Sequence, residues 1–189
     1  GTTVIGTTDA QDLDIRTANT LRVRITQKGQ IETFNTGESV FIGEGAGAAD
    51  NLNDNGNVFV GYQAGNKNTT GFLNTANGSM ALYTNTTGFW NTANGSGALY
   101  SNSIGNYNTA NGFQALRSNT TGYYNTANGM YALYYNEGDN NTALGFDAGD
   151  FNTIGSSNTF VGYSADAASN ALINATAIAG PIAEGSSRF

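Results

Sequence analysis

The chain has 189 residues, with 7 Lys and Arg against 14 Asp and Glu, a formal net charge of −7, and neither cysteine nor histidine. Without cysteine there is no disulfide framework or thiolate metal site, and without histidine the commonest general base is missing. The negative charge argues against a nucleic-acid partner, and no apolar run is long enough for a membrane helix. We therefore expect no enzyme activity, no cofactor, no nucleic-acid binding and no membrane insertion.

Residues 1–37 form a leader without the repeat that follows. Alternating or β-rich patterns begin near residue 2 and cover residues 13–17, 21–26 and 30–34. Turn-forming pairs such as Ala18–Asn19 and Lys28–Gly29 separate them. This alternation of short β-rich runs and turns predicts a short antiparallel meander.

Residues 38–180 form a repeat domain. The sequence Asn-Thr-Ala-Asn-Gly occurs four times at a constant interval, starting at Asn74, Asn91, Asn108 and Asn125. Weaker units start at Ser39, Asn57, Asn141 and Asn158, which gives eight units at nearly equal spacing. A repeat of about 17 residues predicts an all-β parallel β-roll, or β-solenoid, because one unit this short cannot bury its own apolar face.

The two ends of this domain are expected to differ from its middle. Residues 174–180 resemble a partial ninth unit. Pro181 follows directly, and it suits the end of a strand ladder because it donates no backbone hydrogen bond. We interpret residues 181–189 as a C-terminal junction.

Two positions of the unit never vary. The fifth residue is always glycine: Gly43, Gly61, Gly78, Gly95, Gly112, Gly129, Gly145 and Gly162. The eighth residue is always alanine: Ala46, Ala64, Ala81, Ala98, Ala115, Ala132, Ala148 and Ala165. The glycine predicts a corner with positive φ or close backbone approach, and the alanine predicts an interior position with room for one methyl group.

Positions three and nine exchange side-chain volume. Outer units pair a phenylalanine with a small or polar residue: Phe41 with Gly47, Phe59 with Gly65 and Phe160 with Asp166. Middle units pair alanine with leucine: Ala76 with Leu82, Ala93 with Leu99, Ala110 with Leu116 and Ala127 with Leu133. The unit that starts at Asn141 is mixed, with Ala143 and Gly149. This exchange predicts that both positions face one narrow core, since cores tolerate redistribution better than net volume change.

Each unit is expected to contain two short strands, at positions two to four and at about positions seven to ten. Asn-Thr-Thr-Gly turns starting at Asn68, Asn85 and Asn119 would close the coil. Stacking places identical residues above one another, so asparagines at position one should form an amide ladder. A second ladder is expected at position four, from Asn77, Asn94, Asn111 and Asn128.

Aromatic residues also recur at fixed positions. They are Tyr83, Tyr100 and Tyr134 at position ten, and Trp90, Tyr107 and Tyr124 at position seventeen. A single thin roll cannot bury them all. We therefore predict that they are surface contacts, or that they lie at or near contacts between subunits.

The repeats Asn57–Gly65 and Asn125–Leu133 resemble the β-roll repeats of bacterial and phage tail-fibre proteins and, more loosely, the head repeats of trimeric autotransporter adhesins. The leader, from Ile5 to Thr26, is similar to the segment that precedes such repeats in those fibres. Ser186–Phe189 looks like the start of the self-cleaving intramolecular chaperone that often follows, so the chain would be truncated near that start. The central units depart from the adhesin-head pattern, because asparagine replaces an aliphatic residue at position four.

This resemblance implies a parallel homotrimer of β-rolls that forms a rigid shaft or head, outside the cell or on a virion. We accordingly expect a structural segment of a tail fibre or adhesin that contacts cell-surface receptors or carbohydrate. The sequence does not identify the ligand.

Two other uses of the repeat follow from its polar residues. A regular threonine file on a flat solenoid face would order water as an ice-binding surface does; its members are Thr75, Thr92, Thr109, Thr126 and Thr142. Asp139, Asp147 and Asp150 are of the type that ligates a hard cation, but turn residues and solvated charges explain them better. No metal site is therefore expected.

Overall fold

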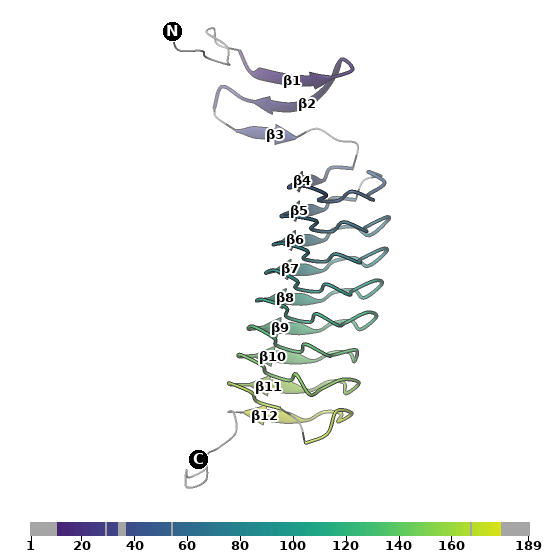
Figure 1. Ribbon diagram of the computed structural model, residues 1–189, viewed down its shortest axis with the longest axis vertical. Helices are drawn as coiled ribbons and strands as arrows, with labels where there is room; N and C mark the ends of the chain where they lie inside the picture. The colour runs from purple at the N-terminus through teal and green to yellow at the C-terminus, as the bar shows by residue number, and fades with distance from the viewer. Residues whose placement is uncertain (1–10, 29, 34–36, 54, 167, 179–189) are drawn as a thin grey trace.

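The computed structural model describes residues 11–28, 30–33, 37–53, 55–166 and 168–178. It shows a small antiparallel sheet followed by a long stack of coils (Figure 1). The stack is a parallel β-solenoid, as the repeat predicted. The described residues contain strands and turns but no helix. Residues 1–10 and the expected junction at 181–189 lie outside the described residues.

The leader folds as the expected meander. Strands β1 (Leu13–Thr17), β2 (Thr20–Ile25) and β3 (Ile31–Thr33) pair antiparallel in that order. Arg24 Nε lies 2.7 Å from one carboxylate oxygen of Asp14, and Arg16 lies 3.0 Å from the other. The hydrogen bond from Arg24 is the main reason that the pKa of Asp14 falls to about 2. This ion pair links β1 to β2 on their solvated face.

Nine three-residue strands, one from each coil, form the second sheet in sequential order. They are β4 (Val40–Ile42), β5 (Val58–Val60), β6 (Thr75–Asn77), β7 (Thr92–Asn94), β8 (Thr109–Asn111), β9 (Thr126–Asn128), β10 (Thr142–Leu144), β11 (Thr159–Val161) and β12 (Thr176–Ile178). Each position pairs with the same position of the next coil, for example Thr92 with Thr109 and Asn94 with Asn111. The ninth, partial unit therefore continues the sheet through β12.

The second strand expected in each coil does not form. Positions six to ten are turns, because positions seven and nine take left-handed backbone angles in most coils and so interrupt an extended chain. In one coil Met80 has φ 55° and Leu82 has φ 54°, and Gln114 and Leu116 repeat the pattern at 54° and 51°. No β-branched residue occupies either position in the described coils, in keeping with the poor fit of such residues at positive φ.

The invariant glycine occupies the predicted corner. All eight residues at position five have φ between 124° and 145°. A Cβ atom on Gly61 would lie 2.5 Å from the carbonyl oxygen of Gly78 in the next coil. The corner therefore needs glycine both for its backbone angle and for the close approach of the neighbouring coil.

The core is the narrow interior between the sheet and the turns. The position-eight alanines from Ala64 to Ala165 are buried, and Ala46 is partly buried in the first coil. Leu82, Leu99, Leu116 and Leu133 fill the middle coils, and Phe59 and Phe160 fill coils near the ends. A Cβ atom on Gly149 would lie 2.6 Å from the Phe160 ring and 2.9 Å from Leu133. Positions three and nine thus share one interior, as their exchange of volume predicted.

Replacing Leu99 with phenylalanine is expected to lower the free energy of unfolding by about 1–3 kcal/mol, because the middle coils have no space for the ring. The double variant Ala93→Gly/Leu99→Phe should recover part of this loss. Urea unfolding followed by circular dichroism would compare the variants with the parent chain. Equal stability of the single variant and the parent would show that position nine does not limit the core.

Buried asparagines form a polar spine beside this core. At position one, the Asn91 amide nitrogen donates to Asn74 Oδ1 at 3.1 Å, and Asn91 Oδ1 accepts the Asn108 backbone N–H at 3.0 Å. This confirms the first ladder. On the outer face of the sheet, Asn94 donates to Asn111 at 2.9 Å, and Asn111 donates to Asn128 at 2.7 Å. The second ladder is therefore also confirmed over these three coils.

A third asparagine ladder was not predicted. It lies at position twelve, where the sequence indicated only turns, and its members are buried: Asn68, Asn85, Asn102, Asn119, Asn136 and Asn152. Successive amides bond as far as Asn119, and then Asn119 Oδ1 has no hydrogen-bond partner within the described structure. The break falls at the unit that starts at Asn125, which is one position shorter than its neighbours, and there the Asn136 amide donates to the Gly138 carbonyl.

Candidate interaction surfaces

The position-seventeen aromatics form a continuous row on one flank of the sheet. The Trp90 and Tyr107 ring centroids are 5.0 Å apart, and Tyr107 stacks on Tyr124 at 4.8 Å. Trp90 is 50% exposed and Tyr124 is 54% exposed. Phe72 and Phe89, one position earlier, stack at 4.8 Å and extend the row. The row is therefore a long aromatic surface without a charged side chain among these residues.

The position-ten aromatics form a second row, but cations lie on it. Tyr83 and Tyr100 stack at 5.2 Å. Arg117 occupies position ten between Tyr100 and Tyr134, with its guanidinium 5.0 Å and 5.7 Å from their ring centroids. Lys67 lies 5.0 Å from the Tyr83 centroid. These half-buried rings thus already have cation–π partners within the chain.

A third row, mostly aromatic, was missed by the sequence reasoning and lies just after the glycine corner at positions six and seven. Its members are Tyr62, Phe113, Met130, Tyr131, Phe146 and Tyr163. Phe146 stacks on Tyr163 at 5.3 Å, and Tyr131 contacts both Phe113 and Phe146 edge to face. The sequence could have indicated this row, because aromatic residues recur at these positions in five of the units. The recurrence was less evident because two middle units carry serine at position six.

The threonine file lies on the outer face of the sheet, in register from coil to coil. Position three faces the core, so positions two and four both face outward. Thr75, Thr92, Thr109 and Thr126 are half-buried there, and Thr142 is exposed. The position-four asparagines run beside them. The middle of the outer face is therefore a flat Thr/Asn surface, bordered at its ends by exposed aliphatic residues such as Ile42 and Leu144.

The three aspartates considered for a cation do not act as one group. The Asp139 carboxylate accepts the Tyr123 backbone N–H at 3.0 Å. Asp150 instead hydrogen-bonds Asp166 of the following coil, whose carboxylate accepts the Phe151 N–H at 2.8 Å. Within the part of the chain that the structure describes, no three acidic residues are grouped so that they would hold a metal ion.

Burial raises the pKa of Asp150 to about 6, and the neighbouring Asp166 carboxyl contributes in the same direction. Burial, with a smaller contribution from the Asp150 charge, also raises the pKa of Asp147. These two carboxyls therefore favour their protonated forms more than an exposed aspartate does.

Replacing Asp150 with asparagine is expected to remove part of the pH dependence of stability. A raised pKa means that the folded chain holds this proton more tightly than the unfolded chain, so stability falls as pH rises from 3.8 towards about 6. With solvent screening of this part-exposed group, we expect a loss of about 1 kcal/mol in the parent. Thermal unfolding at about pH 4 and about pH 7 would measure it. Parallel pH profiles for parent and variant would contradict the assignment.

No helix long and apolar enough to span a membrane occurs in the described ranges. We compared the chain with models of protein families, with curated proteins and with solved structures, and none of the three comparisons found a match.

Proposed function

We propose that this chain is a structural segment of an extracellular or virion-associated fibre, of the tail-fibre or adhesin kind, and that it contacts cell-surface carbohydrate without catalysis. The observation that carries the proposal is the in-register stack of nine parallel strands with aromatic rows along its length. Such a stack gains length by repetition, and every added coil extends both the ladder and the surface rows.

The interior supports a rigid shaft. Each coil is joined to the next by sheet hydrogen bonds and by buried asparagine ladders, so adjacent coils cannot shift without breaking both. The core side chains are alanine, leucine and phenylalanine, and the buried polar side chains are asparagine and one serine. These groups supply close packing and hydrogen bonds between coils, as a rigid shaft requires.

The position-seventeen row fits a second copy of this chain. Another copy has the same rise per coil, so its rings meet this row at a matching spacing over its whole length. The rings of the row carry no charge that would have to be desolvated, and the Asp139 carboxylate lies at one end of the row, where it accepts the Tyr123 backbone N–H. By contrast, packing a subunit on the position-ten row would bury Lys67 and Arg117 at a desolvation cost. We therefore assign the subunit contact of a parallel homotrimer to the position-seventeen side.

The remaining exposed aromatics fit sugars. Tyrosine and phenylalanine rings offer flat apolar faces, and the polar surface around them is mostly uncharged, since only 11% of the residues are charged. Each contact would be weak. Three copies that bind at once would raise the overall affinity without any new contact.

A glycan array and whole-cell binding assays with the purified chain would test this function. We expect binding to neutral glycans and to at least one cell type, and weaker binding when the exposed Tyr163 is replaced by serine. Failure of the parent chain to bind any glycan or cell would reject the contact role and leave only the structural role.

Ice binding is the second candidate, because the threonines lie in register on a flat, outward face. Ice binding would depend on these threonines, whereas carbohydrate binding would depend on the aromatic rings. An ice binder would show thermal hysteresis that disappears when Thr92 and Thr109 are both replaced by lysine, whereas the fibre proposal expects no hysteresis in either protein.

A further inference from the structure

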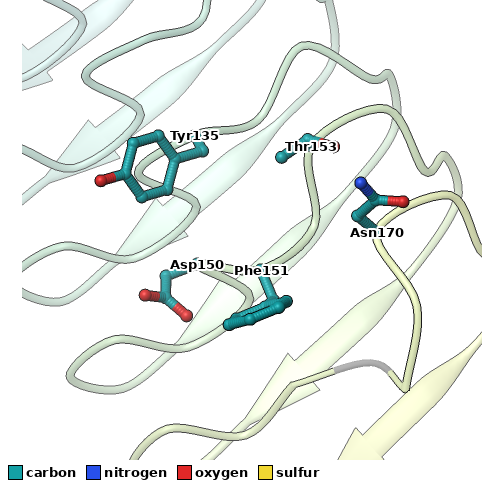
Figure 2. Close-up of a pocket in the computed structure, with 5 residues that line it drawn as sticks. All are labelled: Tyr135, Asp150, Phe151, Thr153 and Asn170. Atoms are coloured by element: carbon teal, nitrogen blue, oxygen red, sulfur yellow. The ribbon is translucent and has the colours of Figure 1, made fainter.

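A cleft of about 220 Å³ opens near the C-terminal end of the solenoid, lined by Tyr135, Asp150, Phe151, Thr153 and Asn170. These residues come from three successive coils. Figure 2 shows Asp150 and Phe151 below Tyr135, with Thr153 and Asn170 to the right. The cleft is next to the shortened unit, where the repeat loses its regularity.

The cleft exists because the sequence departs from the repeat at two positions. Position eleven carries the small residues Thr84, Ser101 and Ser118 in the middle coils, but Tyr135 and Phe151 here. Position ten carries tyrosine in most of those coils, but Asp150 here. At position eleven, two large rings thus replace small residues. At position ten, a carboxylate replaces a tyrosine ring.

The two aromatic walls are open to solvent. Tyr135 is 55% exposed and Phe151 is 68% exposed. The Tyr135 ring packs edge to face on Tyr134, with ring centroids 4.5 Å apart. The Phe151 backbone N–H donates to Asp166 at 2.8 Å. The Tyr135 ring is therefore held by a neighbouring ring, whereas Phe151 is fixed through its backbone and presents an accessible ring.

The polar wall is also held by the fold. The Asn170 backbone carbonyl accepts N–H groups from Thr153, Ile154 and Gly155 at 3.1, 3.0 and 3.1 Å. Asn170 and Thr153 side chains can each donate and accept hydrogen bonds, and an ionised Asp150 carboxylate accepts only. The cleft therefore combines apolar faces with a few placed polar groups, which is the usual composition of a small-molecule site.

We propose that this cleft binds one pyranose ring of a neutral cell-surface glycan. The apolar C–H face of the sugar would lie on Phe151 or Tyr135, hydroxyl groups would donate to Asp150, and Thr153 and Asn170 would bind the remaining hydroxyls. This inference rests on the proposed glycan-contacting function and gives it a location.

The volume of the cleft and the charge of its lining limit which sugars it would bind. The volume is below the roughly 300–1,000 Å³ of pockets for drug-sized molecules, so one ring fits better than an enclosed oligosaccharide. The lining contains a carboxylate and no cation, and Asp166 adds a second carboxylate behind it. Acidic sugars such as sialic acid should therefore be excluded by repulsion.

The test uses methyl glycosides of neutral hexoses, N-acetylhexosamines and sialic acid, with binding to the full chain detected by saturation-transfer difference NMR. Phe151→Ser and Tyr135→Ser restore the small residue of the middle coils, so they should fold. Leu144→Asn is the matched control, because this exposed leucine lies in the same coil as Phe151 but on the outer face of the sheet, and asparagine is the residue that the middle coils carry there. Circular dichroism and thermal unfolding would verify the fold of each variant.

We expect millimolar binding of at least one neutral glycoside, at least tenfold weaker binding in the two cleft variants, and unchanged binding in Leu144→Asn. Equal binding by parent and both cleft variants would place the sugar elsewhere and overturn this inference, while the glycan function would stand. Preference for sialic acid would also overturn it. If the parent binds no glycoside here and nothing on the glycan array, the proposed carbohydrate contact itself fails, and this inference fails with it.

Discussion

Replacing Gly95 with valine is expected to lower the free energy of unfolding by about 3–5 kcal/mol. Gly95 has φ 136°, a region that residues other than glycine enter only with about 1–3 kcal/mol of strain. A Cβ atom there would also collide with the backbone carbonyl of Gly112 in the next coil, so two coils would have to separate. Urea unfolding monitored by circular dichroism measures the loss.

Gly97→Gln is the matched control for this prediction. Gly97 has φ 68°, and the atom nearest to an added Cβ is Gln114 Cγ, on a flexible side chain, at 3.2 Å. Gln63 and Gln114 already occupy the same position with φ 54°. We expect a change below about 1 kcal/mol. If the two variants lost equal amounts of unfolding free energy, the corner at Gly95 would not specifically require glycine.

Replacing Asn91 with leucine, which has the same branched four-atom side-chain skeleton, is expected to cost about 2–4 kcal/mol. Asn91 Oδ1 accepts the Asn108 backbone N–H, and its amide nitrogen donates to the Gly105 carbonyl at 2.8 Å. Leucine would leave the buried Asn108 N–H without this acceptor, and a buried unpaired donor costs about 1–3 kcal/mol by itself. Thermal unfolding of parent and variant would measure the difference.

Asn94→Val is the control for the ladder prediction. Asn94 lies on the outer face, half-buried, and donates one amide bond to Asn111. Other coils carry Val60 and Val161 at the same position. We expect a loss below about 1 kcal/mol. A cost as large as that of Asn91→Leu would mean that the outer ladder stabilises the stack as much as the buried one.

The sequence was sufficient to predict the parallel stack, the glycine corner and the shared core, because each depends on a residue type that recurs at the same position of successive units. Some units pair phenylalanine with glycine, as at Phe59 and Gly65, and others pair alanine with leucine, as at Ala93 and Leu99. This exchange of volume identifies positions three and nine as core positions from the sequence alone. A strict repeat therefore predicts tertiary contacts, since each residue packs mainly against the same position of the adjacent coil.

Other features could not be read from residue types alone. Leu82 and Leu99 adopt left-handed angles that leucine rarely takes, so their pattern favoured a second strand that the backbone does not form. The sequence pattern indicates a turn at Asn85, but the buried hydrogen bond from its amide to Asn68 forms only when coils are stacked. The cleft at Asp150 depends on side chains from three coils, which no single unit shows.

Sedimentation equilibrium of the purified chain at micromolar concentration would test the proposed homotrimer, because that proposal places the contacts between copies on the aromatic row that contains Trp90 and Tyr124. We expect a single species with three times the 19.6 kDa mass of one chain, and a shift towards lower mass when both residues are replaced by serine. A parent chain that sediments at 19.6 kDa across this concentration range would show that the proposed trimer does not form.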